Sequence, residues 1–293
     1  NVATQTRAEP LIEWVLGGVH QEHHRPLPSH QAAAHEVLVI LREHEITIDA
    51  VGHRFVHGGE LFKATTLVDE HSLAGLKQVL PLAPIHNPNS FSAIEVCLAE
   101  LPGVPEFVVF DTAFHAMLPI EAREYALPRD LTDKYGLRKY GFHGLSYQYV
   151  SGRAAALLDL PLEQVKLIMC HLGTGGSSVC AFSNGHSVET SMGFSPLAGL
   201  VMSTRCGDID AEVALELVRQ GMDTDEVSRI LNHKSGLIGL SGYSSNLGEI
   251  IDAAEAGDEQ CRIAYEVYAG RLKHYLGAYT WLLNGADAIV FTD

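Results

Sequence analysis

The sequence has few positive charges for its length. Only 20 lysine and arginine residues stand against 36 aspartate and glutamate residues, which leaves a formal net charge of −16 over 293 residues. Proteins that bind nucleic acids or anionic membranes present basic surfaces, so this balance argues against either as a partner. An anionic substrate would have to be bound by individual arginines, against the overall field of the chain.

Paired cysteines and long apolar runs are also absent from the sequence. No two of the five cysteines form a C-x-x-C pair, and three of them lie in strand-like runs or beside a glycine-rich turn. We therefore expect reduced thiols in a cytoplasmic protein rather than a metal site. No apolar run approaches the length of a membrane span, so we expect no membrane association.

Strand-like and helical patterns alternate along the chain, which predicts an α/β fold with sheets covered by helices. Strands are predicted at residues 50–56, 104–110, 166–170, 178–182 and 186–190. Helices are predicted at residues 29–42, 69–79, 90–101, 146–158, 210–220, 246–256 and 258–284. Residues 11–19 fit a strand, and the histidine-rich residues 20–24 are interpreted as a solvated loop rather than a metal site.

A glycine-rich turn joins the strand at residues 166–170 to the next apolar run. Its glycines, Gly173, Gly175 and Gly176, let the backbone approach a ligand and leave N–H groups to bind it. Together with Arg205, the turn predicts a site for phosphate oxygens. It is neither a Walker A loop nor a Rossmann fingerprint, because no Gly-Lys-Ser/Thr follows and Ser178 replaces the third glycine. A glycine turn between two strands is typical of the actin, hexokinase and Hsp70 class of nucleotide-binding folds.

Four polar residues lie at or just after predicted strand ends, where open α/β sheets bind their ligands. They are Arg54, Asp111, His143 and Arg205. Three of them also have a structural explanation: Arg54 could form an ion pair with Glu60, Asp111 could cap a turn, and His143, as a lone histidine, could be a hydrogen-bonded structural residue.

The sequence resembles the acetate kinase family in seven stretches, which follow that family's order and spacing and span essentially the whole chain. They are GHRFVHGGE (52–60), LAPIHNP (82–88), VFDTAFHAMLP (109–119), KYGFHGLS (139–146), HLGTGGSSVC (171–180), TSMGFSPLAGLVMSTRCGDID (190–210) and SGLIGLSG (235–242). The resemblance implies an α/β fold of two ribonuclease-H-like domains of the actin/hexokinase/Hsp70 type, with mixed sheets flanked by helices. It places an N-terminal domain at residues 1–115 and a C-terminal nucleotide-binding and dimerisation domain at residues 116–293.

The resemblance also implies an activity. The family carries out the reversible, Mg²⁺-dependent transfer of the γ-phosphoryl group of ATP to acetate, which gives acetyl phosphate and ADP by direct in-line transfer. Its members are generally cytoplasmic homodimers. Catalytic roles fall on Arg54, Asp111, His143 and Arg205; substrate binding on Arg54, Val56, Asn87 and Phe142; and nucleotide binding on His171, Gly173, Thr174, Gly175, Gly176 and Ser177. Asp111 is expected to hold Mg²⁺ or its waters, and residues 115–119 are expected to form a hinge.

Two positions within the matching stretches depart from the family. Thr174 stands where the family usually has asparagine, and Tyr147 stands where it usually has a second histidine. The family's first phosphate loop and its adenosine loop have no counterpart in residues 1–293. We therefore expect the natural chain to be longer, with its first strands and its end missing here, and expect these residues alone to have no kinase activity.

Three alternatives to an ATP-dependent acetate kinase stay open at the level of the sequence. A propionate kinase would differ by about one methylene in its pocket, which is worth only about 1–3 kcal/mol of discrimination. A pyrophosphate-dependent acetate kinase is the second alternative. The third is a catalytically inactive regulator that binds nucleotide or acyl phosphate.

Overall fold

The computed structural model describes residues 2–3, 11–24 and 26–293, and its contacts separate the chain into two units, Asn1–Phe110 and Asp111–Asp293. The division falls directly after Phe110, so Asp111 belongs to the second unit. The expected domain boundary after residue 115 stays a prediction. Each unit is described by itself.

A three-stranded sheet in the order β4-β6-β5 supports the first unit. β4 (Val51–Phe55) runs parallel to β6 (Glu106–Phe110), and the short β5 (Thr66–Leu67) pairs antiparallel with β6. Phe55 lies opposite Phe110 in the register, and the ring of Phe62 stacks on that of Phe110 with 4.8 Å between centroids. These three aromatic side chains are buried and form the centre of the unit.

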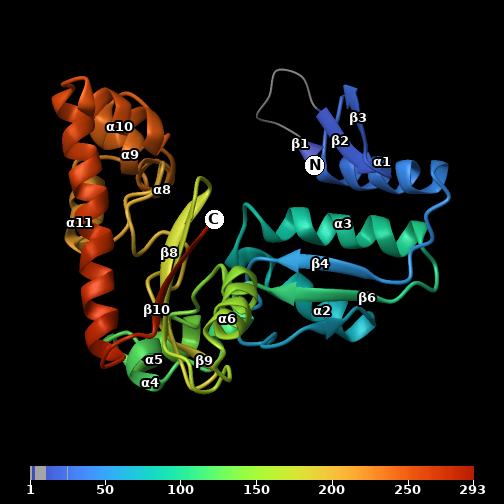
Figure 1. Cartoon of the computed structure of the whole chain (residues 1–293), viewed down its shortest axis with the longest axis horizontal. Coiled ribbons are helices and arrows are strands. Elements are labelled where there is room, and N and C mark those ends of the chain that lie inside the picture. The colour runs from blue at the N-terminus through green and yellow to red at the C-terminus, as the bar shows by residue number, and fades with distance from the viewer. Residues whose placement is uncertain (1, 4–10, 25) are drawn as a thin grey trace. The chain divides into compact units, whose positions relative to one another are not determined.

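Among the described residues of the first unit there are three α-helices, and two of them are capped by the first residue of a predicted helix. Ser29 caps α1 (His30–Glu43), and Asp69 forms a capping box with Ser72 at the start of α2 (Glu70–Gln78). A 3₁₀ turn, η1 (Leu80–Leu82), leads to α3 (Asn87–Glu100). β4 and β6 run between α3 and α2 in Figure 1.

The histidine-rich segment is a strand, so the prediction of a loop at residues 20–24 was wrong. β2 (Leu11–Leu16) and β3 (Val19–His24) form an antiparallel hairpin, and β1 (Val2–Ala3) pairs with β2. The turn consists of Gly17 and Gly18, with φ of 57° and 81°. Two consecutive residues with positive φ form the turn whose twist matches a tight hairpin, and Gly-Gly is a strong sequence signal for it.

The second unit contains a four-stranded mixed sheet in the order β10-β7-β8-β9. β7 (Leu167–Gly173), β8 (Gly176–Ser183) and β9 (His186–Thr190) are antiparallel neighbours, and β10 (Ala288–Thr292) lies parallel to β7. One face packs on α6 (Gly144–Leu158) and the other on the long helix α11 (Glu259–Leu282), seen in red at the end of the colour range in Figure 1. Because both faces are buried, β7 and β8 read as continuous apolar runs.

Some of the remaining helices of the second unit were predicted from the sequence, and others were not. α7 (Ala211–Arg219), α10 (Leu247–Glu255) and α11 are capped by Asp210, Asn246 and Asp258, the first residues of the predicted helices. Five short helices were not predicted from the sequence: η2 (Ala113–His115), α4 (Ile120–Arg123), α5 (Arg129–Tyr135), α8 (Thr224–His233) and α9 (Gly236–Ser241). The expected α/β architecture, with mixed sheets flanked by helices, is confirmed.

All five cysteines lie in the described part of the chain and are free, as predicted. Burial raises the pKa of the Cys170 and Cys180 thiols to about 12, so both stay protonated. Within the described ranges, no helix combines the length and the apolar character that a membrane crossing requires.

Candidate functional site

The glycine-rich turn closes the hairpin between β7 and β8, as the sequence predicts. Gly173 pairs with Gly176 at the end of the hairpin, which leaves Thr174 and Gly175 at its tip. Ser177, nearly fully buried, donates a 3.3 Å hydrogen bond from Oγ to the carbonyl of Gly173. This internal hydrogen bond therefore stabilises the turn, which presents its backbone at the end of the sheet.

Gly176 is the point where two of the predicted catalytic side chains meet. A Cβ on this residue would lie 3.1 Å from Nη1 of Arg205 and 3.6 Å from Nε2 of His143. A glycine therefore lets a guanidinium and an imidazole approach the same piece of backbone. Both groups are good partners for phosphate oxygens, and the sequence separates them by 62 positions.

His143 is held in an unusual backbone conformation. Its φ of 60° lies in the left-handed region, which a residue with a Cβ adopts at a cost. The next residue, Gly144, donates its N–H to the carbonyl of Asp111 at 3.0 Å. A Cβ on Gly144 would lie 2.1 Å from that carbonyl oxygen, so only glycine allows this approach. A hydrogen bond thus connects the backbone of Asp111, a predicted catalytic residue, directly to the segment that carries His143.

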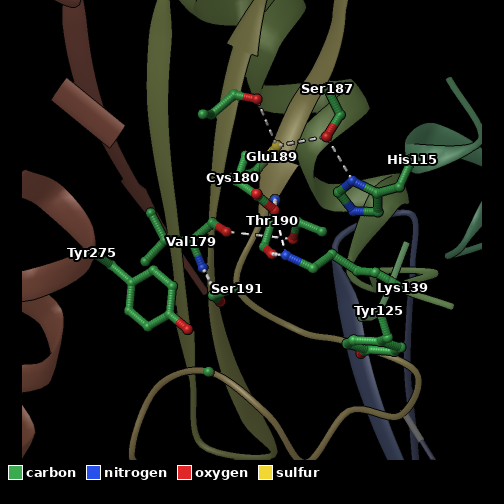
Figure 2. A network of polar contacts seen from close by, with 12 residues as sticks. His115, Tyr125, Lys139, Val179, Cys180, Ser187, Glu189, Thr190, Ser191 and Tyr275 are labelled. Carbon is green, nitrogen blue, oxygen red and sulfur yellow. Dashed lines mark hydrogen bonds and ion pairs between the residues drawn. The ribbon is translucent and has the colours of Figure 1, made fainter. Parts of the chain in front are cut away.

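The segment before His143 is attached to β9, as Figure 2 shows for Lys139. The Lys139 ammonium forms an ion pair with the Glu189 carboxylate and donates to the carbonyl of Thr190 at 3.0 Å. The amide of Tyr140 donates to the carbonyl of Gly193 at 3.1 Å. Backbone and side-chain bonds therefore determine where this segment enters α6.

His115 holds the same segment through a hydrogen bond to its backbone. Its Nε2 donates to the carbonyl of Phe142 at 2.9 Å, and its Nδ1 lies 2.8 Å from the hydroxyl of Ser187, the contact drawn in Figure 2. Complete burial lowers the pKa of His115 to about 4, so the ring is neutral. Phe142 is 1% exposed; its predicted contact with the acetate methyl stays a prediction.

Arg205 lies in the loop between β9 and α7. Its Nη1 donates to the carbonyl of Pro196 at 3.2 Å, which orients the guanidinium. Burial lowers the pKa of Arg205, yet an arginine keeps its charge at neutral pH. A desolvated guanidinium interacts more strongly with an anion than one in water, because less solvent screens the charge.

A cavity of about 290 Å³ opens beside the glycine turn and Arg205. It is lined by Thr174, Gly175, Met202, Ser203, Thr204, Arg205, Ser245 and Asn246. The hydroxyl and amide side chains of this lining were not predicted from the sequence to bind a ligand; they are Ser203, Thr204, Ser245 and Asn246. Asn246 was predicted only as the start of a helix, and it caps α10 by accepting from the amides of Gly248 and Glu249. His171 and Thr174 both belong to the β7–β8 hairpin that forms one wall.

In the first unit, a cavity of about 420 Å³ contains two of the predicted substrate residues, Arg54 and Val56. His53, beside Arg54 in β4, lies 2.7 Å from the buried carboxylate of Glu106, and burial raises the pKa of that carboxyl group. Arg54 is exposed at the end of the strand. A positive charge and an apolar side chain therefore lie in one cavity, as the binding of a small carboxylate requires.

The side chain of Asn87 has a structural task. It accepts from the amide of His57 at 3.2 Å and donates to the carbonyls of His57 and Val79 at 3.0 and 2.8 Å. The residue is completely buried. Its amide is thus used by the backbone of the first unit, and its predicted contact with substrate stays a prediction.

Asp111 has the type of side chain that the predicted magnesium role requires. It follows β6 directly, is 1% exposed, and carries the oxygen ligands that Mg²⁺ prefers. Over the described ranges, the group of three close metal-binding side chains is Glu13, His20 and Glu22 on the exposed β2–β3 hairpin, and Asp111 does not belong to it. A single carboxylate could hold Mg²⁺ only together with other ligands, so the predicted role of Asp111 at the metal stays a prediction.

Comparisons with known proteins show the family of the chain. Residues 3–293 match the acetokinase family. A curated acetate kinase from Halothermothrix orenii is 50% identical over 246 residues, which are 84% of this chain and 62% of that relative. The chain thus spans less than two thirds of that relative's length.

Two solved structures are similar over nearly the whole chain. The acetate kinase of Entamoeba histolytica has a TM-score of 0.90 and 44% identity, over 97% of this chain and 74% of that one. The propionate kinase of Francisella tularensis also has a TM-score of 0.90, with 35% identity, over 99% of this chain and 74% of that one. The chain belongs to the acetokinase family.

Proposed function

We propose that the protein catalyses the reversible, Mg²⁺-dependent transfer of the γ-phosphoryl group of ATP to acetate, giving acetyl phosphate and ADP. The observation that carries the proposal is the approach of Arg205 and His143 to Gly176 in the β7–β8 turn. It provides a fixed positive charge and a hydrogen-bond donor beside a glycine backbone. Phosphoryl transfer needs this combination, because negative charge spreads over the equatorial oxygens in the transition state.

The proposed roles of the residues follow from their chemistry. Arg54 binds the carboxylate of acetate, with Val56 beside it in the same cavity. Arg205 and His143 stabilise the charge on the transferring group, and the turn from Gly173 to Ser177 binds nucleotide phosphates through its amides. Acetate is ionised at neutral pH, so the reaction needs no general base.

The metal supplies electrostatic neutralisation of the nucleotide phosphate oxygens when it is bound. Asp111 is the residue proposed to hold it, directly or through water. An Asp111→Asn variant with wild-type activity and an unchanged Mg²⁺ dependence would contradict this role.

Detection of acetyl phosphate as its hydroxamate, formed from ATP, acetate and Mg²⁺, tests the function in the full-length protein. Replacing Arg205 with Gln should lower kcat by about 10²–10³, the typical cost of one lost transition-state donor. Replacing Arg219 with Gln is the matched control, because that arginine forms ion pairs on the exposed surface of α7. Intact nucleotide binding without any hydroxamate product from the wild type would instead favour a regulator.

Propionate is the second acceptor to compare, because the Francisella tularensis structure with a TM-score of 0.90 is a propionate kinase. The ratio of kcat/KM for the two acids decides between them. We further propose a cytoplasmic homodimer, as in the family generally; the molar mass in solution tests the dimer.

A further inference from the structure

The hydroxyl of Ser178 lies between the side chains of His143 and Tyr147. Its Oγ is 2.8 Å from Nδ1 of His143 and 2.5 Å from the hydroxyl of Tyr147. Ser178 and Tyr147 are completely buried, so water does not compete for these bonds. The three groups therefore form one continuous hydrogen-bond chain from the interior of the unit to the imidazole.

The chemistry of Tyr147 sets the direction of this chain. The phenol oxygen accepts the amide N–H of His171, and burial raises the pKa of Tyr147 well above 10, so the group stays protonated. Its proton is then directed to Oγ of Ser178, because a phenol is a better donor than an aliphatic hydroxyl. Ser178 in turn has a single proton, which it can give to Nδ1 of His143.

The consequence for His143 concerns its other nitrogen. A neutral imidazole that accepts at Nδ1 carries its proton on Nε2. Nε2 is the atom that lies near Gly176, where Arg205 also points. The ring cannot turn freely, since His171 packs against it with 4.1 Å between centroids, and the backbone at His143 is confined to the left-handed region.

We propose that Tyr147, acting through Ser178, is a positioning residue that holds His143 in the tautomer with its proton on Nε2. That N–H donates to an oxygen of the transferring phosphoryl group. The inference rests on the proposed function for the identity of the acceptor. It also gives a role to Tyr147, one of the two positions at which the matching stretches depart from the family.

Two variants interrupt the chain at different links, and a third serves as a control. Tyr147→Phe removes the first donor and keeps the ring, and Ser178→Ala removes the central hydroxyl. Ser151→Ala is the matched control, because it deletes a buried hydroxyl of α6 that donates to the carbonyl of Gln148 at 3.1 Å and not to a histidine. Tyr147→His restores a donor at the first link.

The test combines ¹⁵N NMR of the His143 side chain with kinetics of the full-length protein. In the wild type we expect a single tautomer protonated on Nε2. Tyr147→Phe and Ser178→Ala should lose this single tautomer and lower kcat about ten- to a hundredfold, the usual effect of removing an outer hydrogen-bond partner. KM for acetate and ATP should change less than about twofold, Tyr147→His should recover part of kcat, and Ser151→Ala should keep wild-type kcat.

A wild-type imidazole protonated on Nδ1 would overturn the proposal. So would a Tyr147→Phe or Ser178→Ala variant with unchanged tautomer and kcat. If Tyr147→Phe does not fold, Ser178→Ala alone decides. A wild type that forms no acetyl phosphate refutes the proposed function, while the tautomer measurement still decides whether the hydrogen-bond chain acts as described.

Discussion

The hydroxyl of Tyr275, in α11, donates a 2.6 Å hydrogen bond to Oδ2 of Asp208, in the loop that carries Arg205. The other carboxylate oxygen accepts the amide of Gly199 at 2.7 Å. Arg271, one helical turn before Tyr275, donates to the backbone carbonyls of Gly199 and Asp208. The long helix therefore holds this loop on both sides of Arg205, at Gly199 and at Asp208.

Replacing Tyr275 with Phe should lower the free energy of unfolding by about 1–3 kcal/mol, because Asp208 loses a donor to a charged group. Urea denaturation followed by circular dichroism measures this. Tyr265→Phe makes the same chemical change on a more exposed part of α11 and should stay within about 0.5 kcal/mol of the wild type. Equal effects of the two substitutions would show that the bond to Asp208 contributes nothing.

A methyl group at Gly176 should disturb the proposed site without disturbing the fold. The Cβ of Gly176→Ala would lie 3.1 Å from Nη1 of Arg205, so the guanidinium must move by a few tenths of an ångström. We expect kcat to fall roughly tenfold or more, since transfer reactions depend steeply on position. Gly277→Ala, in α11, is the control, because a Cβ there meets nothing within 4 Å. Steady-state kinetics that do not distinguish the two variants would refute the role of the close approach.

The first residue of α6 should tolerate no side chain. Gly144→Ala would bring a Cβ to 2.1 Å from the carbonyl oxygen of Asp111, so the backbone must shift and the 3.0 Å bond between them must lengthen. We expect a loss of about 2–4 kcal/mol in stability, the range for overpacking and a broken buried bond. In the same helix, Gly152→Ala meets nothing within 4 Å and should stabilise by about 0.5–1 kcal/mol. Thermal denaturation of both variants provides the comparison.

His115 should make stability depend on pH. Its folded pKa of about 4 lies below the ordinary histidine value of 6.5, so the unfolded chain binds a proton first as pH falls. The stabilisation is present above pH 6.5 and is lost between 6.5 and about 4, by about 3 kcal/mol in total.

His115→Gln keeps a donor and an acceptor but does not titrate. Its unfolding free energy should therefore fall less steeply than that of the wild type over this pH window. His274→Gln, at an exposed position of α11, should keep the wild-type slope. A His115→Gln variant that also keeps the wild-type slope would contradict the proposed titration.

Much of the local structure could be predicted from the sequence. Ser29, Asp69 and Asp210 accept amide hydrogen bonds at helix starts, as their positions before amphipathic segments indicate. These signals act between residues a few positions apart, so they can be recognised in a linear pattern. The Gly17-Gly18 turn is an equally local signal for a hairpin, although the histidine-rich residues after it were predicted to form a loop.

By itself, the sequence determined the glycine turn between two strands, the motifs of one enzyme family and the residue types of its site. Only the tertiary structure decided that Gly176 admits Arg205 and His143 together, and that Ser178 joins His143 to Tyr147. Ser178 and Tyr147 are 31 positions apart, and their hydrogen bond exists because α6 packs on the sheet that contains β8. Such a contact depends on how the core packs, which no pattern of neighbouring residues specifies.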